Sequence, residues 1–177
     1  MLAGGDVKVV MIGGMANPNH LEERYSDKGW EFWGLNAIRA KWATDIPWTR
    51  WFNLHRIEHL FRDWEIDLLR EIYWANKHAE IPFYTVGDWT DEISHATEFP
   101  IDSLRSMPRG GIYHAGSFDM MTAFAIHLGA TEIAFHGVRL NMESGEPISA
   151  RACLEYWCGM AEAKGCKITC EIGRAHV

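Results

Sequence analysis

The run Val7-Lys-Val-Val-Met-Ile-Gly-Gly14 decides how the sequence folds. Its first six residues are mostly apolar and β-branched, which is typical of a strand that is buried on both faces. The two glycines that follow predict a tight turn directly after this strand. We therefore start from a buried strand over 7–12 and work outward along the chain.

Further short apolar runs predict strands of the same kind. They cover residues 31–35, 51–55, 83–86, 133–136 and 167–170. Between them lie helical patterns: an amphipathic stripe from Ile57 to Ala75, an apolar segment over 117–128, a segment over 150–164, and shorter segments over 20–28 and 38–43. Strands that alternate with helices predict a Rossmann-like three-layer α/β/α sandwich with a mostly parallel sheet.

Length and composition set the domain organisation. The chain has 177 residues, of which 47% are hydrophobic, and this predicts one domain over residues 1–170. The tail Glu171-Ile-Gly-Arg-Ala-His-Val177 reads as non-native, and we expect the natural chain to continue past Cys170. Residues 87–111 have no strong period and predict a long loop with a short helix, which is often functional.

Charge and hydropathy narrow the class of protein. The formal net charge of -7 argues against non-specific nucleic-acid binding, because phosphates are neutralised by clustered Lys and Arg. No apolar run reaches the roughly 18 residues that a membrane span needs, and the first residues do not resemble a signal peptide. The four cysteines lack the paired C-x-x-C spacing of a zinc site. We expect a cytoplasmic protein without a membrane or nucleic-acid partner.

Small and polar residues follow most of the predicted strands. These residues are Gly13 and Gly14, Asn36, Asn53 and His55, and Gly137 and Arg139. Ligands of open α/β sheets bind at the carboxyl ends of the strands, so these positions are candidate ligand contacts. Each position also has a purely structural role open to it. The glycine pair is not a full G-x-G-x-x-G motif and could form only a turn, Asn36 could cap the next helix, and His55 could be structural, as we expect Arg50 to be.

Two further groups of residues are candidates. Ser117 begins an apolar helix, whose free N–H groups favour an anion, although simple N-capping accounts for a serine there equally well. Glu146, Arg151 and Glu155 gather near the last crossover, where carboxylates could hold Mg²⁺ or act as a base. The alternative is a solvated face in which Arg151 and Glu155 form an i,i+4 ion pair.

Several short motifs, in an unusual order, resemble a group of uncharacterised phage and prophage proteins. The motifs are Trp33-Gly-Leu-Asn36, Arg50-Trp-Phe-Asn-Leu-His55, Gly116-Ser117, Gly137-Val-Arg-Leu140 and Glu155-Tyr156. That group is distantly similar to the MptE-like 6-hydroxymethylpterin diphosphokinases and to bacterial sialyltransferases of Rossmann-like fold. The resemblance implies a nucleotide ligand, of the ATP or the CMP-sugar type. The chain departs from the pattern at Arg139 and Asn53, where the group has an aspartate, at Pro147 and Ser149, where it has aromatic residues, and in the first loop over 13–17, which lacks the usual G-x-G-P-S.

Together these observations predict a nucleotide-using transferase that catalyses glycosyl or pyrophosphoryl transfer. Its nucleotide-binding residues would be Gly13, Gly14, Asn36, Ser117, Gly137, Arg139 and Arg151; its catalytic residues His55 and Glu155; and its metal ligand Glu146, for Mg²⁺. The other substrate would be a small-molecule or glycan acceptor. Two alternatives stay open: a phage protein that binds or sequesters a nucleotide in the host cytoplasm, and an interaction protein. A homo-oligomer is also left open.

Overall fold

The computed structural model describes residues 6–14, 16, 20–21, 24–25, 29–36, 46–111, 113–138 and 148–170. Its elements, in chain order, are β1 (Val7–Ile12), β2 (Trp30–Leu35), β3 (Arg50–Asn53), α2 (Ile57–Asp63), α3 (Glu65–Lys77), β4 (Phe83–Thr85), β5 (Ala96–Glu98), α4 (Ile101–Leu104), the 3-10 helix η1 (Pro108–Gly111), α5 (Ser117–His127), β6 (Ala130–His136), α6 (Ile148–Ala163) and β7 (Lys167–Cys170). The short helices predicted over 20–28 and 38–43 lie largely or wholly outside the described residues.

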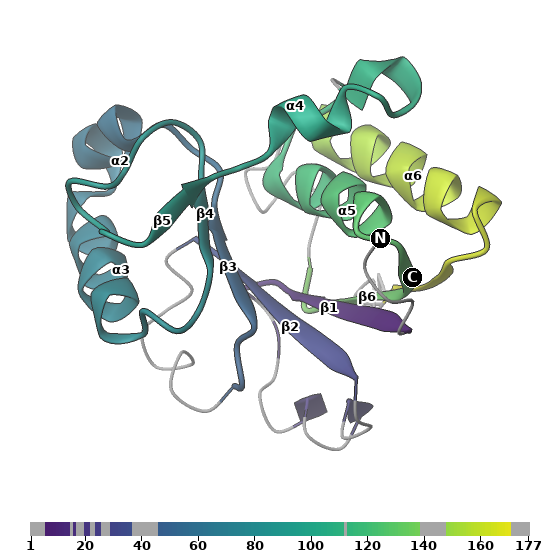
Figure 1. Cartoon of the computed structure of the whole chain (residues 1–177), viewed down its shortest axis with the longest axis horizontal. Helices are drawn as coiled ribbons and strands as arrows, with labels where there is room; N and C mark the ends of the chain where they lie inside the picture. The colour runs from purple at the N-terminus through teal and green to yellow at the C-terminus, as the bar shows by residue number, and fades with distance from the viewer. Residues whose placement is uncertain are drawn as a thin grey trace. The chain divides into compact units, whose positions relative to one another are not determined.

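The fold is the predicted α/β fold with a parallel sheet (Figure 1). The strands follow the order β5-β4-β3-β2-β1-β6-β7. Every strand pair whose register is given runs parallel: β1 with β6, β2 with β3, β3 with β4, β4 with β5, and β6 with β7. The first strand is buried as its sequence predicts, since Val9, Val10, Met11 and Ile12 have no exposed surface.

The contacts divide the chain into two compact units. Unit 1 comprises Met1–Glu31 and Ile101–Val177, and unit 2 comprises Phe32–Pro100, so that the boundary falls within β2. In unit 1, α5 and α6 lie side by side (Figure 1). The buried Trp157 on α6 donates its indole N–H to the backbone carbonyl of Tyr113 at 2.8 Å, which ties this helix to the segment before α5.

Unit 2 has an aromatic core. Trp33, Trp51 and Phe52 are fully or almost fully buried. A glycine is required beside them, because a Cβ atom at Gly34 would lie 2.4 Å from the ring of Trp51. Arg50 is structural, as predicted: its guanidinium donates to the hydroxyl of Tyr84 at 2.9 Å and lies 5.6 Å from the centre of the Trp33 ring.

The third strand is shorter than predicted. It ends at Asn53, whereas the sequence predicts a strand that continues to His55. His55 therefore lies beyond the strand and is exposed, while Asn53 is buried at the strand's last position.

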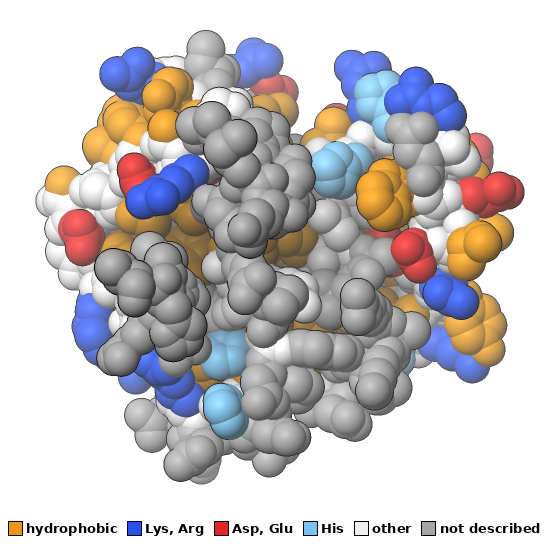
Figure 2. Space-filling view, turned by 180° about the vertical axis from the view of Figure 1, so that it is seen from behind, with side chains coloured by type: hydrophobic (Ala, Val, Ile, Leu, Met, Phe, Trp, Pro, Cys, Tyr) orange, Lys and Arg blue, Asp and Glu red, His pale blue; other side chains and the backbone are white. Residues whose placement is uncertain are grey.

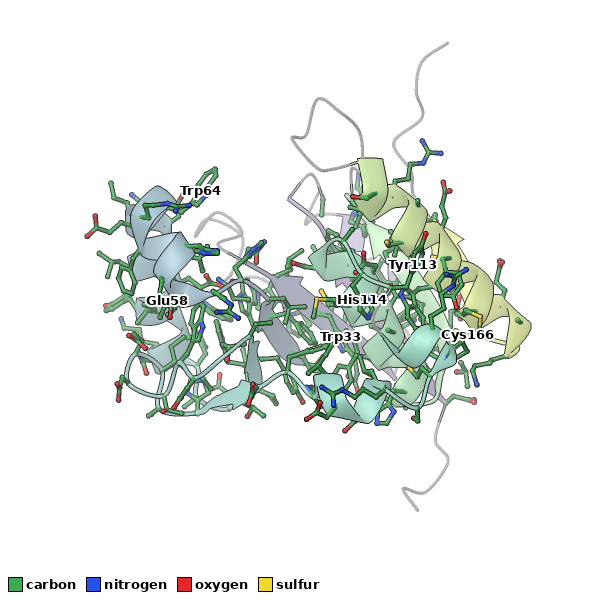
Figure 3. All side chains as sticks on the ribbon, turned by 90° about the horizontal axis from the view of Figure 1, so that it is seen from above. Trp33, Glu58, Trp64, Tyr113, His114 and Cys166 are labelled. Carbon is green, nitrogen blue, oxygen red and sulfur yellow. The ribbon has the colours of Figure 1, made fainter. Side chains whose placement is uncertain are left out.

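The amphipathic stripe from Ile57 to Ala75 is divided between two helices, and its prediction as one helix is wrong. Trp64 interrupts the helical backbone with φ -142 and ψ 31, and it is the N-cap of α3. After this break, α3 buries Leu68, Glu71 and Ala75. Trp64 itself is 64% exposed and stands at the outer end of the α2–α3 pair (Figure 3).

The segment over 87–111 carries more structure than a loop. The predicted short helix is present as α4, and η1 follows it. The strand β5 was not predicted, because it has only three residues, none of them buried.

Charged side chains are spread over the described surface rather than gathered in one large patch on the face that Figure 2 shows. On the face seen in Figure 2, acidic and basic side chains lie singly or in small groups. Among the helices of the described part of the chain, none is long and apolar enough to cross a membrane.

Candidate functional site

A pocket of about 450 Å³ lies within unit 2, where β2 and β3 end and where α2 and α3 meet. Its lining comprises Asn36, Asn53, His55, His59, Leu60, Arg62, Trp64, Asp67, Leu68 and Glu71. The structure therefore brings together two of the predicted site residues, Asn36 and His55. The volume lies in the range of small-molecule sites, which is roughly 300–1,000 Å³.

Asn36 lines this pocket and carries a buried acceptor. Its backbone has φ 52, in the left-handed region that asparagine tolerates better than most residues. Its backbone N–H donates to the carbonyl of Phe52 at 2.8 Å, which fixes the residue just after β2. Its side-chain oxygen Oδ1 is buried and has no hydrogen-bond partner among the residues that the structure describes. A buried acceptor of this kind is usually satisfied, so a ligand donor is the natural partner.

Glu71 is the main pocket residue that the sequence analysis missed. It is 5% exposed, and its carboxylate accepts the indole N–H of Trp51 on Oε1 and the amide Nδ2 of Asn53 on Oε2, both at 2.7 Å. Burial raises the pKa of Glu71 to about 7, although the two hydrogen bonds act in the opposite direction. A signal existed, because positions 68, 71 and 75 share one helical face and the flanking Leu68 and Ala75 are apolar.

The mouth of the pocket is more basic than its floor. His55, His59 and Arg62 line it, and all three are exposed. The backbone N–H of His55 donates to Oδ1 of Asn53 at 3.4 Å, which connects the mouth to the buried amide. Asp67 also lines the pocket and forms an ion pair with Arg70 at 3.4 Å. The arrangement can hold a ligand whose hydrogen-bond donors face the floor and whose anionic group faces the histidines.

The predicted glycines lie in unit 1. Gly13 follows β1, and its N–H donates to the carbonyl of His136 at 2.8 Å. A Cβ atom at Gly13 would lie 2.4 Å from the carbonyl oxygen of Gly137, so the close approach of these two backbones explains this glycine. Gly137 has φ 66, which also favours glycine. Gly14 differs, because a Cβ atom there would meet nothing within 4 Å. Packing against the described residues therefore explains the glycine at position 13 but not the glycine at position 14.

Ser117 is not the N-cap of its helix, and that part of the prediction is wrong. The N-cap is Gly116, and the buried carboxylate of Asp119 accepts the N–H groups of Ala115 and Gly116 at 2.9 and 3.0 Å. The other oxygen of Asp119 lies 3.1 Å from Nδ1 of His114. An acidic side chain therefore already serves the N-terminal end of α5, so an anion would have to compete with it.

The last predicted group is only partly described. Arg151 and Glu155 form an exposed ion pair at 2.8 Å on α6, one helical turn apart. The exposed ion pair is the alternative to a catalytic or phosphate-binding role that the i,i+4 spacing left open. Arg139 and Glu146 lie outside the described residues. In the described part of the chain, no group of three or more His, Cys, Asp or Glu side chains could hold a metal ion.

Comparison with known proteins identifies structures of similar fold. The sialyltransferase CstII from Campylobacter jejuni in complex with the substrate analogue cytidine-5'-monophosphate superposes with a TM-score of 0.56 at 15% identity, over 95% of this chain and 81% of that chain. The complex of the same enzyme with CMP-3FNeuAc gives 0.60 at 16% identity, over 92% and 79%. A complex of this sialyltransferase with a trisaccharide acceptor and CMP gives 0.54 at 16% identity, over 92% and 80%.

At these identities the similarity shows a shared fold. No protein-family model matches the sequence. No curated protein matches it either.

Proposed function

We propose that the protein is a glycosyltransferase that uses a nucleotide sugar of the CMP type and transfers the sugar to a glycan or small-molecule acceptor. The observation that carries the proposal is the pocket in unit 2, which is lined by the exposed basic side chains His55, His59 and Arg62 and by Asn36, whose buried Oδ1 has no partner among the described residues. The fold that this chain shares with transferases solved with CMP supports the choice of nucleotide.

The nucleoside would occupy the floor of the pocket. Cytosine carries an exocyclic amino group, and ribose carries hydroxyl groups, so both can donate to the Asn36 oxygen and to the acceptors around Glu71. The phosphate would lie toward His59 and Arg62, which supply N–H donors and, in the guanidinium, a positive charge. A nucleotide therefore matches both ends of the pocket.

His55 would act as the general base. The acceptor hydroxyl attacks the anomeric carbon of the sugar, the bond from that carbon to the phosphate oxygen breaks, and CMP leaves. The acceptor proton passes to the His55 imidazole, the type of side chain that most often takes this role. Its exposure at the pocket mouth leaves room for an acceptor.

Other predicted contacts remain proposals. Gly14, Ser117 and Arg151 as nucleotide contacts, and Glu155 as a catalytic residue, belong to unit 1 and stay predictions. The roles of Arg139 and of Glu146 with Mg²⁺ depend on residues outside the described part of the chain.

The test measures CMP release from CMP-sugars with and without glycan acceptors. We expect acceptor-dependent release that falls about 100-fold or more in His55→Ala, the size typical of a lost general base, while CMP binding is kept. His127→Ala is the matched control and should keep full turnover, because it removes an exposed imidazole that does not line the pocket. Full turnover in His55→Ala would remove this residue from the mechanism. If CMP binds but the CMP-sugars stay intact, the protein would instead be one that sequesters a nucleotide.

A further inference from the structure

The contacts of Glu71 fix the orientation of a neighbouring amide. The indole N–H of Trp51 can only donate, so Oε1 of Glu71 must accept from it. The other oxygen, Oε2, lies 2.7 Å from Asn53. An ionised carboxylate has no proton to give, so Asn53 must present its Nδ2 to Glu71. Its carbonyl oxygen Oδ1 then faces the other way and accepts the N–H of His55 at 3.4 Å.

We infer that Glu71 is a positioning residue: its ionised carboxylate holds the Asn53 amide in the orientation that the pocket needs to bind a hydrogen-bond donor of the ligand, and its protonation releases that amide to turn over. The inference rests on the proposed function for the identity of the ligand. The control of Asn53 by Glu71 rests on unit 2 alone.

Protonation would reverse the hydrogen bond between the two side chains. Because Oε1 still accepts from Trp51, the added proton belongs on Oε2. A protonated Oε2 donates, so Asn53 can turn and accept with Oδ1, while its NH₂ group moves to the side that Oδ1 held and the backbone N–H of His55 loses its acceptor. An acceptor on the floor of the pocket is thereby exchanged for a donor. The pKa of Glu71, raised by burial to about 7, brings this exchange into the neutral range.

The ionisable groups that share the pocket with Glu71 come from three elements. They are His55 after β3, His59 and Arg62 on α2, and Asp67 on α3. A phosphate would also contact His59 and Arg62, so its binding would not report on Glu71 alone. A ligand without phosphate avoids these contacts, so cytidine is the suitable probe.

The first experiment observes the amide directly, by NMR of ¹⁵N-labelled protein between about pH 5.5 and 8.5, a range that brackets a midpoint near neutrality. In the wild-type protein we expect the Trp51 indole and Asn53 side-chain signals to shift with one midpoint near neutral pH. We also expect an NOE between the Asn53 NH₂ group and the His55 backbone N–H to appear at low pH. In Glu71→Gln the turned amide should be permanent, because the Gln oxygen accepts from Trp51 and its NH₂ group can only donate to Asn53.

Glu65→Gln is the matched control, since Glu65 is an exposed acid on the same helix and should leave the wild-type behaviour unchanged. An Asn53 amide that keeps one orientation at all pH values, or that is the same in Glu71→Gln as in the wild type at pH 8, would overturn the inference.

The second experiment measures cytidine binding at pH 8 and pH 6. If only the ionised form binds, a pKa near 7 predicts about tenfold weaker binding at pH 6. Glu71→Gln should bind weakly at both values, and Glu65→Gln should follow the wild type. Equal affinity at both pH values in the wild-type protein would contradict the role in binding. If cytidine binds at neither pH while the amide turns as expected, the proposed ligand is wrong and the control of Asn53 by Glu71 is supported.

Discussion

Replacing Glu71 by Gln removes the buried charge but keeps a side chain that can form hydrogen bonds. The variant therefore shows how much the charge alone contributes to the free energy of unfolding. Gln has the same shape and keeps one acceptor for Trp51, so the variant should fold. It has no ionisation in the accessible pH range. The difference in the free energy of unfolding between Glu71→Gln and the wild type therefore isolates the protonation of this one carboxyl.

Whether stability rises or falls with pH depends on which state, folded or unfolded, holds the proton of Glu71 more tightly. The pKa of Glu71 is raised from 4.5 to about 7 in the folded protein, mainly by burial. Between these two values the folded state keeps a proton that the unfolded state has lost, so wild-type stability falls as the pH rises through this window. The fall is about 1.4 kcal/mol per pH unit, or about 3 kcal/mol in all. Above about pH 7 the contribution is constant.

Urea unfolding followed by tryptophan fluorescence at pH 5, 6, 7 and 8 measures this difference. Between pH 5 and pH 8 we expect the stability of Glu71→Gln relative to the wild type to rise by about 2.5 kcal/mol, with little of the change above about pH 7. The control Glu65→Gln should show no such trend, because its side chain is exposed. If the Glu71→Gln and wild-type stabilities run parallel at all four pH values, the carboxyl is not held in a medium that raises its pKa, and the reasoning fails.

Three further predictions concern unit 1. Gly13→Ala would place a methyl group against a backbone carbonyl and should lower the free energy of unfolding by about 1–3 kcal/mol. Gly14→Ala meets open space and should melt within a few degrees of the wild type. Equal melting temperatures for the two variants would contradict this. Asp119→Ala leaves two N–H groups without their acceptor and should cost about 2 kcal/mol in urea unfolding, and a loss below about 0.5 kcal/mol would refute the capping role. Arg151→Gln should change stability by less than about 0.5 kcal/mol, since its ion pair with Glu155 is exposed, and a larger loss that salt does not reduce would show another contact.

Much of the fold could be predicted because its strands are apolar, β-branched runs. The run over 7–12 is buried from Val9 to Ile12, as an apolar strand inside a parallel sheet should be. β5 could not be predicted, since none of its three residues is buried and it depends on pairing with β4. The break at Trp64 could not be predicted either. The apolar residues keep their helical spacing through this position, although the backbone there is not helical.

The candidate site could be predicted only in part. Asn36 and His55 could be predicted because ligands of an α/β sheet bind at the carboxyl ends of its strands, and both residues follow a strand. Glu71 was missed because a charged residue on a helix is usually solvated, and its burial depends on Trp51 and Asn53 from a distant strand. Ser117 was expected to be the N-cap because serine is common there, but the N-cap is Gly116, and Asp119 in the first turn accepts the N–H groups of Ala115 and Gly116.

The most direct test of the proposed function is the affinity of Asn36→Gly for CMP, measured by isothermal titration calorimetry beside the wild type. Glycine adopts a φ of 52 without strain, so this variant removes the unpartnered amide and keeps the backbone. We predict that the wild-type protein binds CMP and that Asn36→Gly binds at least about tenfold more weakly, the equivalent of about 1.4 kcal/mol, with an unchanged melting temperature. Equal affinity in the two proteins, or no CMP binding by the wild type, would contradict the assignment of this pocket to a nucleotide.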